Sequence, residues 1–129
     1  MNVSMGLDRL GRGRILVVED DDDLRPSLVD VLARAGFSVR EARHGAQAFE
    51  LLRSESKPDA ILLDLMMPVM DGWEFRARQK SDPELCDTPV VVLTANDTAQ
   101  AAAIDAYRVL SKPFSLASLV DVVDSVVEH

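Results

Sequence analysis

Runs of consecutive apolar residues alternate along this chain with segments in which apolar residues recur every three or four positions. The clearest runs cover residues 15–18, 60–63 and 90–93, and charged or turn-forming residues bound them. Short apolar runs with such boundaries are typical of strands that are buried on both faces of a sheet. The segments between the runs have the period of amphipathic helices.

The pattern predicts an α/β fold in which a strand and a helix alternate five times. We expect strands at residues 15–18, 37–42, 60–64, 89–93 and 107–111, and helices at 24–35, 45–53, 73–80, 98–105 and 116–127. This alternation indicates a parallel sheet with helices on both faces. Right-handed crossovers restrict it to a doubly wound sheet, whose ligand site lies outside the carboxyl ends of the strands.

Local residues predict where two of the helices end or begin. Gly36 follows the first helical stripe and is a favourable residue for a helix C-terminus. Ser115 precedes the last stripe and is a favourable N-cap.

Size and charge narrow the class of protein. A chain of 129 residues, 47% of them hydrophobic, is expected to form one globular domain. Its net charge of −8 argues against direct binding to nucleic acid or to acidic membranes, because both require clustered Lys and Arg. We expect residues 1–13, where glycines lie between charged residues, to be a flexible lead-in and residues 14–129 to form the domain.

Cys86 is the only cysteine, so no internal disulfide can form, which fits a reducing and therefore cytoplasmic compartment. No apolar run approaches the roughly 18 residues that a membrane-spanning helix requires. We therefore expect no membrane insertion.

Five consecutive carboxylates, Glu19–Asp23, follow the first strand. Such a run is unfavourable, because like charges repel one another. Capping of the next helix explains one or two of these acids, since Asp is favoured at an N-cap and in the first helical turn. Capping does not explain Glu19 and Asp20, which come first after the strand.

Residues capable of chemistry stand at four of the five strand ends. Glu19 and Asp20 follow the first strand, Asp64 ends the third, and Thr94 and Lys112 follow the fourth and fifth. Each has an ordinary explanation by itself: the acids are common in turns, a threonine often ends a strand, and most lysines are on the surface. Their joint occurrence at one edge of a parallel sheet favours a shared site.

Three clustered carboxylates are tolerable only with a cation, and all-oxygen ligands with room for water suit Mg²⁺. A divalent ion can hold a phosphoryl group against a carboxylate, which makes Asp64 a credible nucleophile that forms an acyl phosphate. The Thr94 hydroxyl and the Lys112 ammonium could hold the phosphoryl oxygens. No general base is needed, because a carboxylate is already ionised at neutral pH.

Four stretches and the spacing between them carry a family resemblance: residues 15–21 (ILVVEDD), 64–72 (DLMMPVMDG), 89–95 (PVVVLTA) and 111–114 (SKPF). With this spacing, roughly residues 14–128 resemble the receiver domain of bacterial two-component response regulators. The resemblance implies a flavodoxin-like (βα)5 fold, a doubly wound parallel sheet with strand order 2-1-3-4-5.

The resemblance also implies roles for the site residues. Asp64 would be the phosphoacceptor, with a histidine kinase or phosphotransfer protein as the donor. Asp20 and Asp64 would bind Mg²⁺ directly, Glu19 mainly through water, and Met66 through its main-chain carbonyl.

Thr94 and Lys112 would contact the phosphoryl group and couple its arrival to a conformational change. The protein would then act on an unknown downstream protein, with homodimer formation open. Apart from accepting and slowly losing its own phosphoryl group, the domain would not be an enzyme that turns over a substrate.

The chain departs from the family pattern where the family transmits its signal. Val109 stands three residues before the lysine, where the family usually has Tyr or Phe. The segment between Thr94 and Lys112 is about one helical turn shorter than is usual, and Asp105-Ala106 replaces the Gly-Ala that often precedes the fifth strand. We therefore expect intact chemistry, a short or displaced fourth helix and an altered output surface.

Alternative functions remain open. A degenerate receiver that binds partners without phosphorylation would account for Val109 and the short fourth helix, although every expected site residue is present. A Mg²⁺-dependent phosphohydrolase usually has a second acid two residues after its nucleophilic Asp, where this chain has Met66. Flavin binding is disfavoured, because the acids after the first strand would repel a phosphate.

Overall fold

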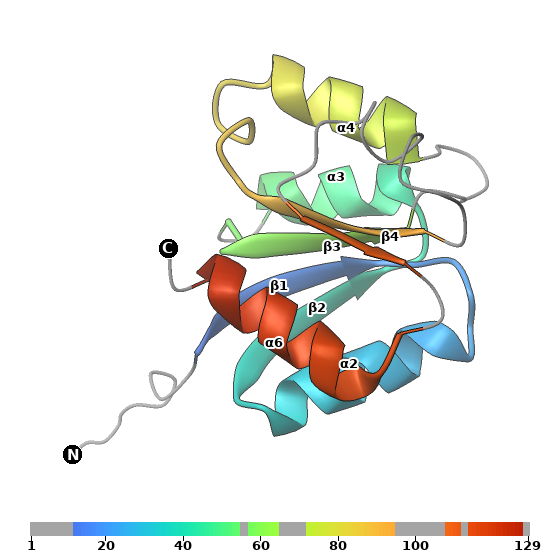
Figure 1. Cartoon of the computed structure of the whole chain (residues 1–129). Helices are drawn as coiled ribbons and strands as arrows, with labels where there is room; N and C mark the ends of the chain where they lie inside the picture. Colours follow the sequence, from blue (N-terminus) through green and yellow to red (C-terminus); the bar gives the residue numbers. More distant parts are fainter. Residues whose placement is uncertain (1–11, 55–56, 65–71, 95–107, 112–113, 128–129) are drawn as a thin grey trace.

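Five parallel strands form a sheet in the order β2-β1-β3-β4-β5, which confirms the predicted topology (Figure 1). The computed structural model describes residues 12–54, 57–64, 72–94, 108–111 and 114–127. The strands are β1 (Gly13–Val18), β2 (Phe37–Ala42), β3 (Ala60–Asp64), β4 (Val90–Thr94) and β5 (Arg108–Ser111).

Helices cover both faces of the sheet (Figure 1). The helices α2 (Leu24–Arg34) and α6 (Leu116–Val127) lie on one face, and α3 (Gly45–Ser54) and α4 (Gly72–Ser81) lie on the other. The predicted boundaries of the described elements agree with the structure to within two residues. The predicted helix at residues 98–105 lies outside the described residues.

Both predicted helix ends have the expected local structure. Gly36 follows α2 with a φ of 107°, a conformation that glycine adopts without strain. The Ser115 hydroxyl oxygen accepts a hydrogen bond from the Ser118 N–H at 3.0 Å and so caps α6. No helix in the described part of the chain combines the length and apolarity that crossing a bilayer requires.

The order of the strands places a switch point between β1 and β3. The chain runs from β1 outward to β2 and then returns to the other side of β1, where it forms β3. Ligands bind outside the carboxyl ends of the strands at such a point. Val18 and Leu63 are partners in the register, so Glu19 and Asp64 leave neighbouring strands at the same level.

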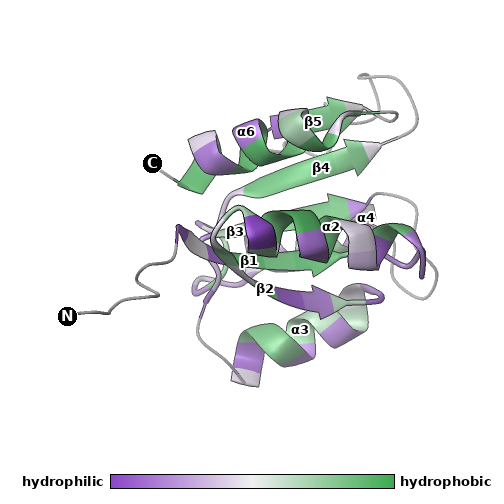
Figure 2. Ribbon diagram, turned by 90° about the horizontal axis from the view of Figure 1, so that it is seen from below, coloured by the Kyte–Doolittle hydropathy of each residue, from purple (hydrophilic) through white to green (hydrophobic). Residues whose placement is uncertain are grey.

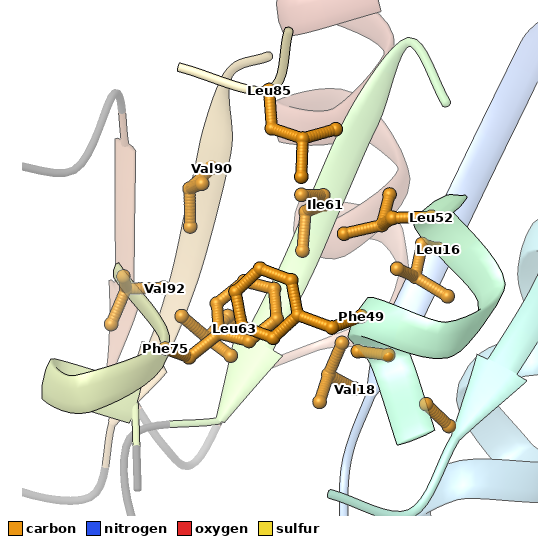
Figure 3. Packing of buried hydrophobic residues seen from close by; sticks show 12 residues of the cluster. Leu16, Val18, Phe49, Leu52, Ile61, Leu63, Phe75, Leu85, Val90 and Val92 are labelled. Atoms are coloured by element: carbon orange, nitrogen blue, oxygen red, sulfur yellow. The ribbon is translucent and has the colours of Figure 1, made fainter. Parts of the chain in front are cut away.

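The central strands alternate their side chains between two hydrophobic cores. On β3, Ile61 belongs to the core under α3 and α4, and Leu62 belongs to the core under α2 and α6. Phe49 and Phe75 stack in the first core, with ring centroids 4.7 Å apart (Figure 3). Figure 2 shows β1, β3 and β4 as largely hydrophobic, whereas the edge strand β2 is partly hydrophilic. All of β3 is buried, as its continuous apolar run predicted.

A buried glutamine shapes the connection between α4 and β4. Gln79 has no exposed surface, and its side-chain nitrogen donates hydrogen bonds to the carbonyls of Leu85 and Thr88, both at 2.8 Å. Its side-chain oxygen accepts a hydrogen bond from Arg76 at 2.7 Å. The amide therefore satisfies two main-chain carbonyls of a connection that has no regular secondary structure.

Replacing Gln79 with Leu is expected to lower the free energy of unfolding by about 2 to 4 kcal/mol, because two buried carbonyls lose their donor. Urea unfolding measures the change. Arg78→Leu, on the exposed side of the same helix, removes only a surface ion pair with Glu74 and is expected to cost less than about 1 kcal/mol. Equal stabilities of the two variants would contradict the role given to Gln79.

Candidate metal centre

The carboxyl ends of β1 and β3 bring three carboxylates together. One oxygen from each of Glu19, Asp20 and Asp64 lies within 4.8 Å of the others. Glu19 and Asp64 are buried, and Asp20 is more open to solvent. The structure therefore gathers the three acids that the sequence predicted as metal ligands.

Asp21 and Asp22, two further acids of the run after β1, have other roles. Asp21 Oδ1 accepts hydrogen bonds from the N–H groups of Asp23 at 2.8 Å and Leu24 at 3.0 Å, so Asp21 caps the start of α2. Glu19 Oε2 accepts a hydrogen bond from the Asp21 N–H at 3.1 Å. The prediction that capping explains only part of this acidic run is confirmed.

Asp22 forms an ion pair with Arg25 and is not part of the acidic cluster. Arg25 Nη2 donates a hydrogen bond to Asp22 Oδ1 at 2.7 Å. This hydrogen bond, followed by the charges of Arg43 and Arg25, holds the pKa of Asp22 below its usual range. The same hydrogen bond raises the pKa of Arg25, against the effect of its burial.

Thr94 lies at the same edge of the sheet as the acids. It is buried at the end of β4, one residue beyond Leu93, which is the register partner of Asp64. Thr94 is itself in register with Ser111 on β5, and Lys112 is the next residue of the chain. Lys112 and Met66 lie outside the described residues, so their predicted roles stay predictions.

The donor set fits a hard divalent cation. Carboxylate oxygens are the ligands that Mg²⁺ and Ca²⁺ prefer, and three carboxylates this close repel one another strongly without a positive charge. The arrangement can therefore hold a cation beside Asp64, outside the carboxyl ends of the strands, where this type of fold binds ligands.

Arg25 is the structural feature of this region that the sequence interpretation missed. It is buried in the first turn of α2, directly beside the acidic run. The signal available in the sequence was a basic residue two positions after five acids, at helical spacing from Asp22.

Comparison with known proteins agrees with the fold. The model of the response regulator receiver domain family matches residues 15–124. The response regulator MprA of Mycolicibacterium vanbaalenii is 43% identical over 110 residues, which are 82% of this chain and 46% of that protein.

Two solved structures show the same likeness. The chemotaxis protein CheY4 of Vibrio cholerae superposes with a TM-score of 0.80 at 28% identity, covering 88% of this chain and 97% of that one. The signal receiver domain of a signal transduction histidine kinase from Syntrophus aciditrophicus has a TM-score of 0.82 at 28% identity and covers 90% of each chain.

The chain belongs to the response regulator receiver domain family. It spans about half the length of the curated relatives that it matches. The family assignment therefore concerns the receiver domain, and it confirms the resemblance that the four sequence stretches carried.

Asp20→Asn is expected to stabilise the metal-free protein, because it removes one of three clustered negative charges. Unit charges about 5 Å apart interact by roughly 1 to 3 kcal/mol near a protein surface, so the free energy of unfolding should rise by about 1 kcal/mol. Urea unfolding in the presence of a chelator measures this gain, which added salt should reduce.

Asp121→Asn is the matched control, since it makes the same change at an exposed position of α6. If Asp20→Asn were no more stable than this control at low salt, the carboxylates would not be under mutual repulsion.

Proposed function

We propose that Asp64 is the phosphoacceptor of this receiver domain and that its donor is a phosphohistidine on a histidine kinase or phosphotransfer protein. The observation that carries the proposal is the meeting of the Glu19, Asp20 and Asp64 carboxylates at the switch point of the sheet. Thr94, on the neighbouring strand, supports it, because it adds a buried hydroxyl to the same edge.

In the transfer, a carboxylate oxygen of Asp64 forms a bond to phosphorus while the bond between phosphorus and the donor's imidazole nitrogen breaks. The electron pair of the broken bond returns to the nitrogen, and Asp64 becomes an acyl phosphate. No general base is required, because the attacking carboxylate is already ionised at neutral pH. Hydrolysis of the acyl phosphate later restores the carboxylate.

The cation that fits this site best is Mg²⁺. Asp20 and Asp64 would bind it directly, Glu19 mainly through water, and the carbonyl of Met66 would complete the protein ligands. Bound Mg²⁺ would neutralise the charge of the phosphoryl oxygens and so allow an anionic carboxylate to approach them.

Thr94 and Lys112 would hold the phosphoryl oxygens. Their contacts would couple the arrival of the phosphoryl group to a conformational change. Val109, where the family usually has an aromatic residue, is partly buried and packs against the core under α3 and α4. A valine has no ring to swing between a buried and an exposed position. The signal would therefore leave the site by another movement near Thr94 and Lys112.

The biological role that follows is a cytoplasmic switch, not an enzyme that turns over a substrate. Phosphorylation would change binding to an unknown downstream protein or to a second copy of the chain. The acidic character of the chain, with a net charge of −8, supports regulation through proteins and not direct contact of this domain with nucleic acid.

Incubation with acetyl phosphate and Mg²⁺ is expected to produce a slower-migrating band of the wild-type protein on a phosphate-affinity gel. Asp64→Asn should abolish this band, because an amide cannot form the acyl phosphate. Lys112→Ala should reduce the band about tenfold or more, through loss of a charge that stabilises the transferring group. Omission of Mg²⁺ should have a similar effect.

Asp121→Asn makes the same substitution at an exposed position away from the acids and should be phosphorylated like the wild type. A band that persists in Asp64→Asn would place the phosphoryl group elsewhere. The absence of any band in the wild type would favour the degenerate receiver instead.

A further inference from the structure

Arg25 is a buried cation that connects three segments of the chain. Only 5% of the residue is exposed, and a buried charge is costly unless hydrogen-bonding partners surround it. Its guanidinium donates to the main-chain carbonyl of Glu19 at 2.9 Å, to Asp22 Oδ1 at 2.7 Å and to Glu41 Oε1 at 3.1 Å. One side chain thus joins the end of β1, the loop after it and strand β2.

These contacts hold the main chain of Glu19 from both sides. Its N–H donates a hydrogen bond to the carbonyl of Ala42 at 3.0 Å, and its own carbonyl accepts the hydrogen bond from Arg25. The peptide group that carries this carbonyl leads directly into Asp20. Arg25 therefore restrains the backbone at the point where the chain turns from one clustered acid to the next.

Repulsion among the carboxylates works against this arrangement. When no cation is bound, the three acids lower their energy by moving apart. The backbone can move most easily in the loop after β1, residues 19–23, because this loop belongs to neither β1 nor α2. Opening this loop would break the hydrogen bond from Arg25 to Glu19 and leave part of a buried guanidinium without an acceptor, which is unfavourable.

We propose that Arg25 is a positioning residue for the cation. It keeps Glu19 and Asp20 in the conformation in which their carboxylates meet that of Asp64, so that little rearrangement is needed when Mg²⁺ binds. Arg25 acts through the main chain and not as a ligand, because a guanidinium repels a metal ion. The inference rests on the proposed function, since it takes the acidic cluster as the Mg²⁺ site.

Charge and positioning predict opposite effects of removing Arg25. Arg25→Met removes a positive charge beside the site and the ion pairs that Arg25 forms with Asp22 and Glu41, so charge alone predicts tighter binding of Mg²⁺. Loss of positioning predicts weaker binding, by about tenfold if Arg25 resembles other groups that orient metal ligands from outside the ligand shell.

The experiment compares Mg²⁺ binding by calorimetry in the wild type, Arg25→Met, Arg25→Lys and Arg34→Met. Arg34→Met is the matched control: it lies on the same helix, removes the same charge and breaks an exposed ion pair with Asp30 at 3.0 Å. Arg25→Lys keeps the charge, but a point-like ammonium cannot reproduce the fixed fork of the guanidinium.

We expect both Arg25 variants to bind Mg²⁺ more weakly than the wild type, by about tenfold for Met and less for Lys, and Arg34→Met to bind normally. The stabilisation against urea that saturating Mg²⁺ adds should fall in parallel. In phosphorylation by acetyl phosphate, the Mg²⁺ concentration for half-maximal rate should rise, while the rate at saturating Mg²⁺ stays near that of the wild type.

The inference would be overturned, with the metal site intact, if Arg25→Met bound Mg²⁺ as tightly as Arg34→Met. The same holds if the Mg²⁺ affinity of Arg25→Lys matched that of the wild type. If Arg25→Met does not fold, the Lys variant decides between charge and positioning. A wild-type protein that binds no Mg²⁺ would overturn the metal site and this inference together.

Discussion

The parallel sheet brings three negative charges together at the carboxyl ends of two central strands. Much of the surrounding structure follows from this constraint. β1 and β3 are hydrogen-bonded neighbours that run in the same direction, so Glu19, Asp20 and Asp64 leave the sheet at the same level. The strands cannot separate to relieve the repulsion, because hydrophobic cores on both faces hold them. The folded chain therefore keeps its acids close together, in an arrangement that a divalent cation would complete.

The acids of the run after β1 have different contacts and roles. Glu19 and Asp20 turn toward Asp64, Asp21 caps α2, and Asp22 faces Arg25. A carboxylate that accepts main-chain N–H groups or pairs with a guanidinium no longer adds its full repulsion to the cluster. Four of the five consecutive acids thus become compatible with one another because neighbouring residues meet different partners.

Much of the fold and of the site was predictable from local patterns. The apolar runs marked β1, β3 and β4, because a strand buried on both faces has few polar positions. Gly36 and Ser115 marked helix ends through backbone and side-chain chemistry that acts within a few residues. The clustered acids could be found because a parallel sheet gathers whatever follows its strands, and Glu19 and Asp64 stand at such ends.

The sequence by itself determined the order of strands and helices along the chain and which residue types stand at the strand ends. Local periodicity is enough to locate these elements and their ends. Only the tertiary structure decided how closely the acids approach, how buried they are, and that Arg25 and Gln79 are interior side chains. These properties depend on contacts with residues distant in the sequence: Arg25 is buried because Glu41 on β2 lies beside it, and Gln79 because the chain before β4 folds over it. No local pattern encodes such a contact, because it exists only once the sheet and its helices have packed.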